Sequence, residues 1–265
     1  MTRFSEALIK ANTVLDPSIR EHLERYNGPF SEILKENERI ARENQFPICQ
    51  DTGLVECFCS LGHRVALEEP LQQTLENAVS ETYRAYPFRD STVAEPLFQR
   101  TPLKDNVPPT VHLFQTEGTA LEIRFLIKGG GSENLSRFFA LEPSAGAEEV
   151  ENRVLDLIRE KGAMSCPPLH IGIGIGGSSE TAFLNAKLAL TDPITARSEH
   201  PDYRILEDRL LRKLNELSIG FQGLGEGPTA LSVHIKYEPT HIATLPLAIA
   251  VDCYLNRKGV VRFED

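Results

Sequence analysis

Glycine recurs at alternate positions of a predicted strand over residues 169–177 (LHIGIGIGG), and this pattern constrains the fold more than any other. A helix is predicted directly after it. Gly172, Gly174 and Gly177 match G-x-G-x-x-G, the fingerprint of dinucleotide-binding sites. Such a site would also need an acidic residue at the end of a second strand, but Asp192 follows the helix with no strand before it. We therefore interpret the glycines as positions that let the backbone turn tightly beside a ligand or another chain.

Segments with helical and with extended periodicity are interspersed along the rest of the chain. Helices are predicted over 1–44 in several pieces, 71–86, 147–161 and 203–217, and strands over 110–115, 120–128, 230–237 and 240–252. The first two of these strands flank a short glycine-containing turn and are predicted to form a hairpin. Neither a composition shift nor an internal repeat divides the sequence. The prediction is an α+β fold, with mixed sheets flanked by helices and a helical N-terminal segment, in a single domain over residues 1–265.

The chain is acidic, with a formal net charge of −10 over 265 residues. Affinity for nucleic acid comes mainly from Lys and Arg, so we expect no nucleic-acid partner. The same charge repels anions at long range, so a dicarboxylate substrate would need cations close to its site or on another chain. No apolar stretch approaches the roughly 18 residues that span a bilayer, and the N-terminus lacks a secretory signal. We expect no membrane partner and a cytoplasmic location.

The five cysteines are Cys49, Cys57, Cys59, Cys166 and Cys253. Cys57 and Cys59 fall on one face of an alternating segment, which favours packing in a core. The other three are far apart in the sequence and lack the short spacing of structural zinc and ferredoxin sites. Three dispersed thiolates could hold a [4Fe–4S] cluster that keeps one iron free of protein ligands, as a Lewis acid. Three unrelated core cysteines are the alternative.

Several other segments carry residues that suit an anionic substrate. The stretch Lys128-Gly129-Gly130-Gly131-Ser132-Glu133-Asn134 follows a strand, and it forms either an anion-binding loop or a flexible turn. Arg89 and Arg100 lie in a proline-rich loop over residues 87–110, where an arginine can clamp a carboxylate or simply face solvent. Asp51 and His241 could transfer protons, but a loop-capping aspartate and a structural histidine are equally consistent with their settings.

Taken in order, these motifs resemble one family. They are Pro47-Ile48-Cys49-Gln50-Asp51-Thr52-Gly53, the stretch from Lys128 to Asn134, Cys166-Pro167-Pro168 with the glycine loop after it, and Thr240-His241-Ile242-Ala243 before Cys253. From residue 5 to residue 256 the chain is similar to the N-terminal domain of class I fumarases and to the alpha subunit of L-tartrate dehydratase. The resemblance implies an oxygen-sensitive [4Fe–4S] hydro-lyase that adds or removes water on a small dicarboxylate, without net redox chemistry.

The resemblance also implies a role for each matching residue. Cys49, Cys166 and Cys253 would bind the cluster. Gln50, Asp51 and the glycines at 129–131, Gly130 and Gly131 among them, would line the substrate pocket, and Arg89 would pair with a substrate carboxylate. Asp51 and His241 would pair near the reacting centre as the catalytic groups.

The chain departs from the family pattern at several places. Thr181 stands where the family usually has lysine, Glu226 adds a charge to a glycine loop, and the residues after Cys253 lack the Arg-His that fumarases often show. No stretch of residues 1–265 resembles the family's swivelling C-terminal domain, which is expected on another chain. The resemblance therefore implies a beta subunit that completes the active site, in a hetero-oligomer such as two alpha and two beta chains. The chain alone is expected to be inactive.

The substrate is open between two dicarboxylates that differ by one hydroxyl group. Malate and fumarate are expected because fumarate is the commoner metabolite, and the alternative is tartrate, which dehydration converts to oxaloacetate. Two other classes of protein also stay open. One is a catalytically silent iron–sulfur scaffold subunit, and the other is a nucleotide-binding protein built on Gly172, Gly174 and Gly177.

Overall fold

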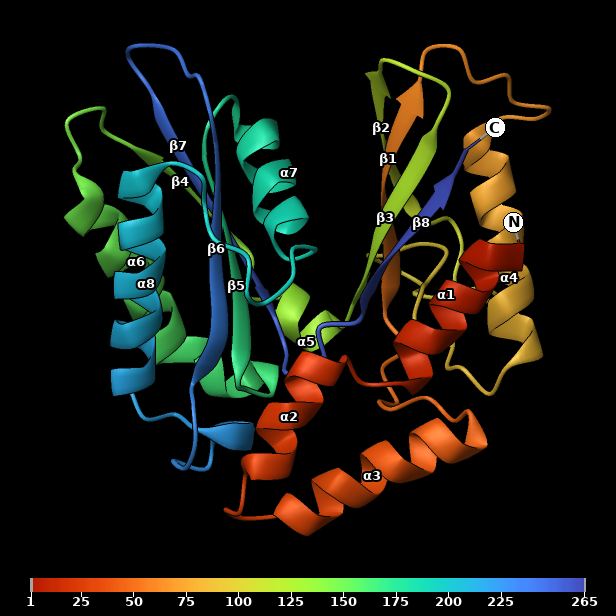
Figure 1. Ribbon diagram of the computed structural model, residues 1–265, viewed down its shortest axis with the longest axis horizontal. Coiled ribbons are helices and arrows are strands. Elements are labelled where there is room, and N and C mark those ends of the chain that lie inside the picture. Colours follow the sequence, from red (N-terminus) through yellow and green to blue (C-terminus); the bar gives the residue numbers. More distant parts are fainter. Residues whose placement is uncertain (1, 265) are drawn as a thin grey trace. The chain divides into compact units, whose positions relative to one another are not determined.

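The computed structural model describes residues 2–264, which fold into two compact units that interleave along the chain. Unit 1 comprises the residues up to 24, residues 32–130 and the residues from 257 onward; unit 2 comprises residues 25–31 and 131–256. Each unit contains a four-stranded mixed sheet flanked by helices, and the N-terminal segment is helical (Figure 1). The predicted α+β class is confirmed. The single-domain assignment over residues 1–265 stays a prediction.

The sheet of unit 1 has the strand order β2-β1-β3-β8, with helices α1 and α4 on one face (Figure 1). The bounds of these elements are α1 Thr2–Thr13, α4 Leu71–Ala85, β1 Leu54–Gly62, β2 Thr110–Thr116, β3 Leu121–Lys128 and β8 Lys258–Phe263. Alternate residues of the strands pack on the helices, as when Phe125 meets Phe4 edge-on with ring centroids 5.5 Å apart. This period of two is the alternation that predicted the strands.

The predicted hairpin over residues 110–128 is wrong, because β2 and β3 do not pair with each other. β1 lies between them, parallel to β2 and antiparallel to β3. The connection between β2 and β3 passes the end of β1, where the amide of Gly62 donates to the carbonyl of Ala120 at 2.9 Å. Two strand spacings are only about 10 Å, which a four-residue connection can cross. Alternation tells which residues face a core and leaves the neighbouring strand undetermined.

The sheet of unit 2 has the strand order β4-β7-β5-β6, with α7 on one face and α6 and α8 on the other (Figure 1). The bounds are β4 Arg137–Leu141, β5 Leu169–Gly176, β6 Ala230–Glu238, β7 Leu245–Asp252, α6 Ala147–Lys161, α7 Ser179–Ala189 and α8 Pro201–Glu216. Between α6 and β5 runs a short 3-10 helix over Gly162–Ser165. The short elements β4, β8 and α5 (Gly130–Glu133) were not predicted.

Helix α7 packs directly on the backbone of β5, and this contact explains the alternating glycines. A Cβ atom on Gly172 would stand 2.0 Å from the carbonyl oxygen of Ala186, and one on Gly174 would stand 1.9 Å from that of Ala182. No real side chain tolerates such distances, so only glycine lets the helix approach this closely. The predicted close approach to the backbone is present, but what approaches is a helix of the same unit and not a ligand or another chain. The glycines therefore give no support to a nucleotide site.

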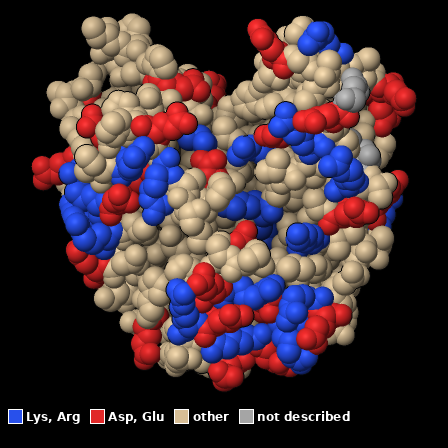
Figure 2. Space-filling model, viewed as in Figure 1, with Lys and Arg blue, Asp and Glu red and all other residues tan. Residues whose placement is uncertain are grey.

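Helix α3 (Ser31–Asn44) carries interleaved charges of both signs, visible at the bottom of Figure 2. Arg39, for example, bonds Glu36 at 2.7 Å and Glu43 at 2.5 Å. Exposed pairs at this spacing contribute only a few tenths of a kcal/mol each. The neighbouring helix α2 covers Pro17–Arg25. Among the described residues no helix has the length and apolar character to cross a membrane.

Candidate active site

The loop over residues 48–53, which precedes β1, is fixed from several sides within unit 1. The amide of Ile48 donates to the carbonyl of Asn12 (2.8 Å), and Asn37 Nδ2 donates to the carbonyl of Ile48 (2.9 Å). Further along, the Tyr83 hydroxyl donates to the carbonyl of Thr52 (2.7 Å), and Asn106 Nδ2 donates to that of Gly53 (2.5 Å). Gly53 has a φ of +74°, a conformation that side chains disfavour. The PICQDTG motif is therefore a rigid loop that presents its central residues.

Asp51 is held by backbone amides on both oxygens of its carboxylate. Oδ1 accepts from Gly53 at 3.0 Å, and Oδ2 accepts from Gly130 at 2.8 Å. Gly130 begins α5, so the stretch predicted as either an anion-binding loop or a flexible turn is a helical turn, and its first amide binds a carboxylate of the same unit. A Cβ on Gly129 would stand 3.1 Å from Asp51 Oδ2, so the glycine run also makes room for the aspartate.

Arg89 and Gln50 lie together next to this loop. Arg89 Nη1 donates to Gln50 Oε1 at 3.5 Å, and the Thr52 hydroxyl donates to the carbonyl of Arg89 at 2.6 Å. Both long side chains are exposed, so they are accessible to a ligand. Arg100 lies elsewhere in the loop, where its Nη1 donates to the carbonyl of Pro96. Of the predicted substrate residues, unit 1 thus brings together Gln50, Asp51, Arg89 and Gly130.

Unit 2 brings the segments of Cys166 and Cys253 together. The amide of Tyr254 donates to the carbonyl of Cys166 at 3.2 Å, so the residue after one cysteine bonds the backbone of the other. The buried Asp252 supports the second segment, because its Oδ1 accepts the amide of Cys253 at 3.0 Å and the hydroxyl of Ser132 at 3.1 Å. Gly131 belongs to this unit as well, while Cys49 belongs to unit 1.

The chemistry of the five thiols separates them into two classes. Cys57 and Cys59 have no solvent-exposed surface, and burial raises the pKa of Cys57 well above its usual value and that of Cys59 to about 12. They stay protonated and pack in the core, as predicted. Cys49 and Cys253 are half-buried and Cys166 is exposed, with a left-handed φ of 48°. Only these three suit iron, although within neither unit, among residues 2–264, do three metal-binding side chains come together.

His241 lies in an exposed turn before β7, where its Nδ1 accepts the amide of Ala243 at 3.1 Å. The adjacent Thr240 hydroxyl donates to the carbonyl of Gly177 at 3.0 Å, which places the turn beside the start of α7. Cys253 follows the last residue of β7, so the histidine and the cysteine lie at opposite ends of this eight-residue strand. At 3.3 Å per residue the two ends are roughly 25 Å apart.

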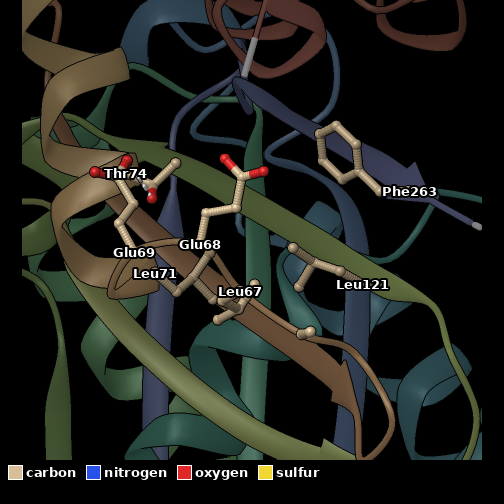
Figure 3. A pocket seen from close by; sticks show the side chains of 8 residues that line it. Leu67, Glu68, Glu69, Leu71, Thr74, Leu121 and Phe263 are labelled. Atoms are coloured by element: carbon tan, nitrogen blue, oxygen red, sulfur yellow. Dashed lines mark hydrogen bonds between the residues drawn. The ribbon is translucent and has the colours of Figure 1, made fainter.

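None of the predicted site residues is among those that line two cavities of the described chain. One, of about 590 Å³ in unit 1, has an apolar floor and two carboxylates at its rim (Figure 3). Its lining includes Leu121 and Phe263, and Leu121 begins β3 whereas the Asp51 loop adjoins the other end of that strand. The other, of about 500 Å³ in unit 2, is lined by both acidic and basic side chains, Glu207 and Lys236 among them. Neither has the surplus of cations that a dicarboxylate requires.

One buried cation beside this site escaped prediction. Arg257 is only 4% exposed, and its Nη2 would stand 3.7 Å from a Cβ on Gly129. The sequence suggests no reason for an arginine near the C-terminus to be buried there.

Comparison with known proteins gives a consistent family. The profile of the family described as fumarate hydratase (Fumerase) matches residues 2–262, and so spans both units. A Methanocaldococcus jannaschii protein, provisionally named L(+)-tartrate dehydratase subunit alpha, is 35% identical over 98% of this chain and 95% of its own length. The L(+)-tartrate dehydratase subunit alpha of Escherichia coli K12 is 33% identical over 81% of this chain and 72% of its own length. That of Escherichia coli UTI89 is 34% identical over 82% and 72%.

Proposed function

The chain belongs to the fumarate hydratase family of hydro-lyases, and from that premise we propose that it is the cluster-bearing alpha subunit of an iron–sulfur hydro-lyase for a small hydroxy-dicarboxylate. The observation that carries this proposal is the convergence of Gln50, Asp51, Arg89 and Gly130 in unit 1. A guanidinium and an amide lie beside a carboxylate that two backbone amides orient. Such a set can bind one acidic group of a substrate and handle a proton at the neighbouring carbon.

The cluster ligands in this proposal are Cys49, Cys166 and Cys253. They are the three cysteines with exposed surface, whereas the two fully buried thiols are excluded by their raised pKa. A [4Fe–4S] cluster held by three thiolates supplies a Lewis acid through the iron that lacks a protein ligand. The protein positions the substrate: Arg89 pairs with one carboxylate, and Gln50 and Gly131 offer hydrogen bonds around it. Gly130, whose amide is bound to Asp51, lines the pocket with its backbone.

Of the two candidate substrates, L(+)-tartrate is favoured by the names of the relatives, which cover most of this chain. Malate and fumarate, expected from metabolite abundance, are second and accord with the family description. The two substrates differ by one hydroxyl, and a site built to bond that group rejects an analogue without it. The ratio of kcat/KM for tartrate and malate is therefore the quantity to measure.

A beta subunit completes the enzyme in this proposal, as the words "subunit alpha" in the relatives' names suggest. The proline-rich loop offers an anchor for it, because Leu97 and Phe98 are 72% and 85% exposed. The carboxylate of Glu95 fixes this tip by accepting the amides of Leu97 (2.7 Å), Phe98 (2.6 Å) and Gln99 (2.8 Å). Backbone hydrogen bonds, that of Gln99 first, lower the pKa of Glu95, so the tip stays fixed at neutral pH.

His241 acts on a second copy of the chain in this proposal. It lies roughly 25 Å from Cys253 along β7, too far for both to serve one cluster site in a single chain. An assembly with two alpha chains would let each supply its histidine to the other's Asp51. Because His241 is exposed in a turn, it is available for such a contact.

The test combines spectroscopy with turnover on the anaerobically reconstituted alpha–beta complex. Mild oxidation should remove the unligated iron and give a [3Fe–4S] paramagnetic signal near the free-electron g value. Dehydration of tartrate or malate should then follow the intact cluster content. A cluster without turnover on either substrate would favour the silent scaffold subunit, and a complex that holds no iron or sulfide would refute the proposal.

A further inference from the structure

We propose that Arg257 is a positioning residue for Asp51, whose carboxylate it holds in a single orientation by a buried positive charge. The inference rests on the proposed function, because it is the hydro-lyase reaction that gives Asp51 its role. It adds a residue that the family motifs do not include.

Arg257 is a buried cation without a carboxylate partner. Arg257 is 4% exposed. Its Nη1 donates to Oδ1 of Asn12 at 3.0 Å, and Asn12 is a neutral residue with no exposed surface. Among residues 2–264 no carboxylate oxygen lies within 4.0 Å of its guanidinium nitrogens. Buried arginines are rare unless they are paired, so this charge needs an anion nearby.

The carboxylate of Asp51 lies beside the same glycine, Gly129, as this guanidinium. The point where a Cβ on Gly129 would stand is 3.1 Å from Asp51 Oδ2 and 3.7 Å from Arg257 Nη2. Both groups therefore lie within 4 Å of the point where a side chain at position 129 would begin, and that side chain would crowd the carboxylate. This gives Gly129 a reason to be glycine that does not depend on its φ.

The position of Arg257 is fixed through Asn12 and β3. Asn12 binds the guanidinium with its side chain, and its carbonyl accepts the amide of Ile48, the residue before Cys49. The carbonyl of Arg257 accepts the amide of Ile127 at 2.8 Å. The buried cation and the PICQDTG loop thus share one anchor on α1, so loss of the guanidinium would loosen the support of the loop that carries Asp51.

The experiment uses the alpha–beta complex with Arg257→Gln, Arg257→Lys and Asp51→Asn. Arg257→Gln should lower kcat about 100-fold with KM within about threefold, because misplacement of a reacting group by about 1 Å costs that much. Adding Asp51→Asn to Arg257→Gln should lower kcat no further than Asp51→Asn does alone. Arg262→Gln replaces an exposed arginine of the adjoining strand β8, so it is the matched control and should leave kcat unchanged.

Chemical rescue separates positioning from folding. Arg257→Ala leaves a guanidinium-sized space, so guanidinium ion at non-denaturing concentration should restore kcat at least tenfold, while urea and sodium chloride should not. A tenfold rise in KM with unchanged kcat would mean that Arg257 binds substrate directly, and would overturn the proposal. Losses in kcat that multiply in the double variant would also overturn it.

Urea unfolding tests this inference without any enzyme activity, so its outcome does not depend on whether the proposed function is correct. If the two charges interact, the urea midpoint of the double variant Arg257→Gln with Asp51→Asn should fall by at least about 0.2 M less than the sum of the falls in the two single variants. Additive falls in the midpoint would refute the coupling even in an active enzyme. Coupled midpoints in a complex that turns over neither dicarboxylate would support the pairing and refute the proposed function instead.

Discussion

The carboxylate of Asp51 and the amide of Gly130 are joined at 2.8 Å across 79 positions of sequence. The bond ties two of the sequence motifs, PICQDTG and KGGGSEN, to each other within unit 1. Asp51 therefore does more than cap its own loop, because the KGGGSEN segment also fixes the orientation of its carboxylate. Each motif by itself has an ordinary structural explanation, and the bond from Gly53 confirms the loop-capping one for Asp51.

Asp51→Asn should therefore inactivate the complex without loss of the cluster. The amide NH2 of asparagine would face one of the two backbone amides, which then lacks an acceptor. We expect kcat to fall about 1,000-fold and the free energy of unfolding to fall by about 1 kcal/mol. Steady-state kinetics and urea unfolding measure the two effects. Asp156→Asn, an aspartate whose side chain is 71% exposed, is the control and should change neither.

Gly174→Ala should destabilise unit 2. Its methyl group would stand 1.9 Å from the carbonyl oxygen of Ala182, so α7 must move away from β5. Overpacking of this kind costs about 3 kcal/mol, visible as a lower urea midpoint with an unchanged slope. Gly146→Ala is the matched control, since no atom lies within 4 Å of the added methyl there. Equal stability of the two variants would contradict the packing explanation for the alternating glycines.

Features that neighbouring residues determine could be predicted from the sequence, whereas features that depend on segments far apart in the sequence could not. Cys57 and Cys59 were placed correctly in the core because alternation along one strand determines their side. The predicted partner strand of β2 was wrong. Periodicity shows that a segment is a strand, but it does not show which other strand pairs with it. Helix α5 and strands β4 and β8 were missed because they are too short for a periodic signal.

The same reasoning applies to the site. Gln50, Asp51 and Arg89 could be proposed because motifs name them, and the structure shows them close to one another in unit 1. Arg257 could not, because its burial depends on Asn12, which lies 245 positions earlier. No local pattern distinguishes a buried arginine from a solvated one, and only the fold reveals it.

The stability of the protein should decline in alkali because of Cys59. Its pKa is about 12 in the folded chain and about 8.5 in an unfolded one, so above pH 8.5 the unfolded state releases a proton that the folded state retains. A group with a raised folded pKa stabilises below the unfolded value and loses that effect as pH rises. The free energy of unfolding should fall by up to about 1.4 kcal/mol per pH unit from this group.

Cys59→Ala isolates that contribution. Urea unfolding of the reduced protein between pH 8.5 and pH 10.5 should show a shallower decline in the variant than in the parent. Val55→Ala is the control, because it also shortens a fully buried side chain of β1 but removes no ionisable group, so its decline should run parallel to that of the parent. Parallel curves for Cys59→Ala and the parent would show that the Cys59 thiol ionises as readily in the folded state as in the unfolded one.

Phe98→Glu should weaken binding of the beta subunit. The side chain is 85% exposed on a tip that Glu95 fixes, so its replacement disturbs no packing within the chain. Loss of an aromatic anchor at an interface raises Kd at least tenfold, which sedimentation or titration calorimetry can measure. Ile205→Glu, a residue 59% exposed on α8, is the matched control. Equal Kd for Phe98→Glu and the parent would place the beta subunit elsewhere.

Mixed complexes should reveal that His241 serves a second chain. Complexes built with Asp51→Asn alone or with His241→Asn alone should each be inactive. If the histidine of one alpha chain reaches the aspartate of another, a mixed assembly contains one site with both groups intact. Co-expression of differently tagged variants and tandem purification should then recover about a quarter to a half of the parental kcat per cluster. Activity that never rises above the inactive parents, with clusters intact, would show that both residues act within one chain or that His241 has no catalytic role. The roughly 25 Å between His241 and Cys253 at the two ends of β7 makes restored activity the expected result.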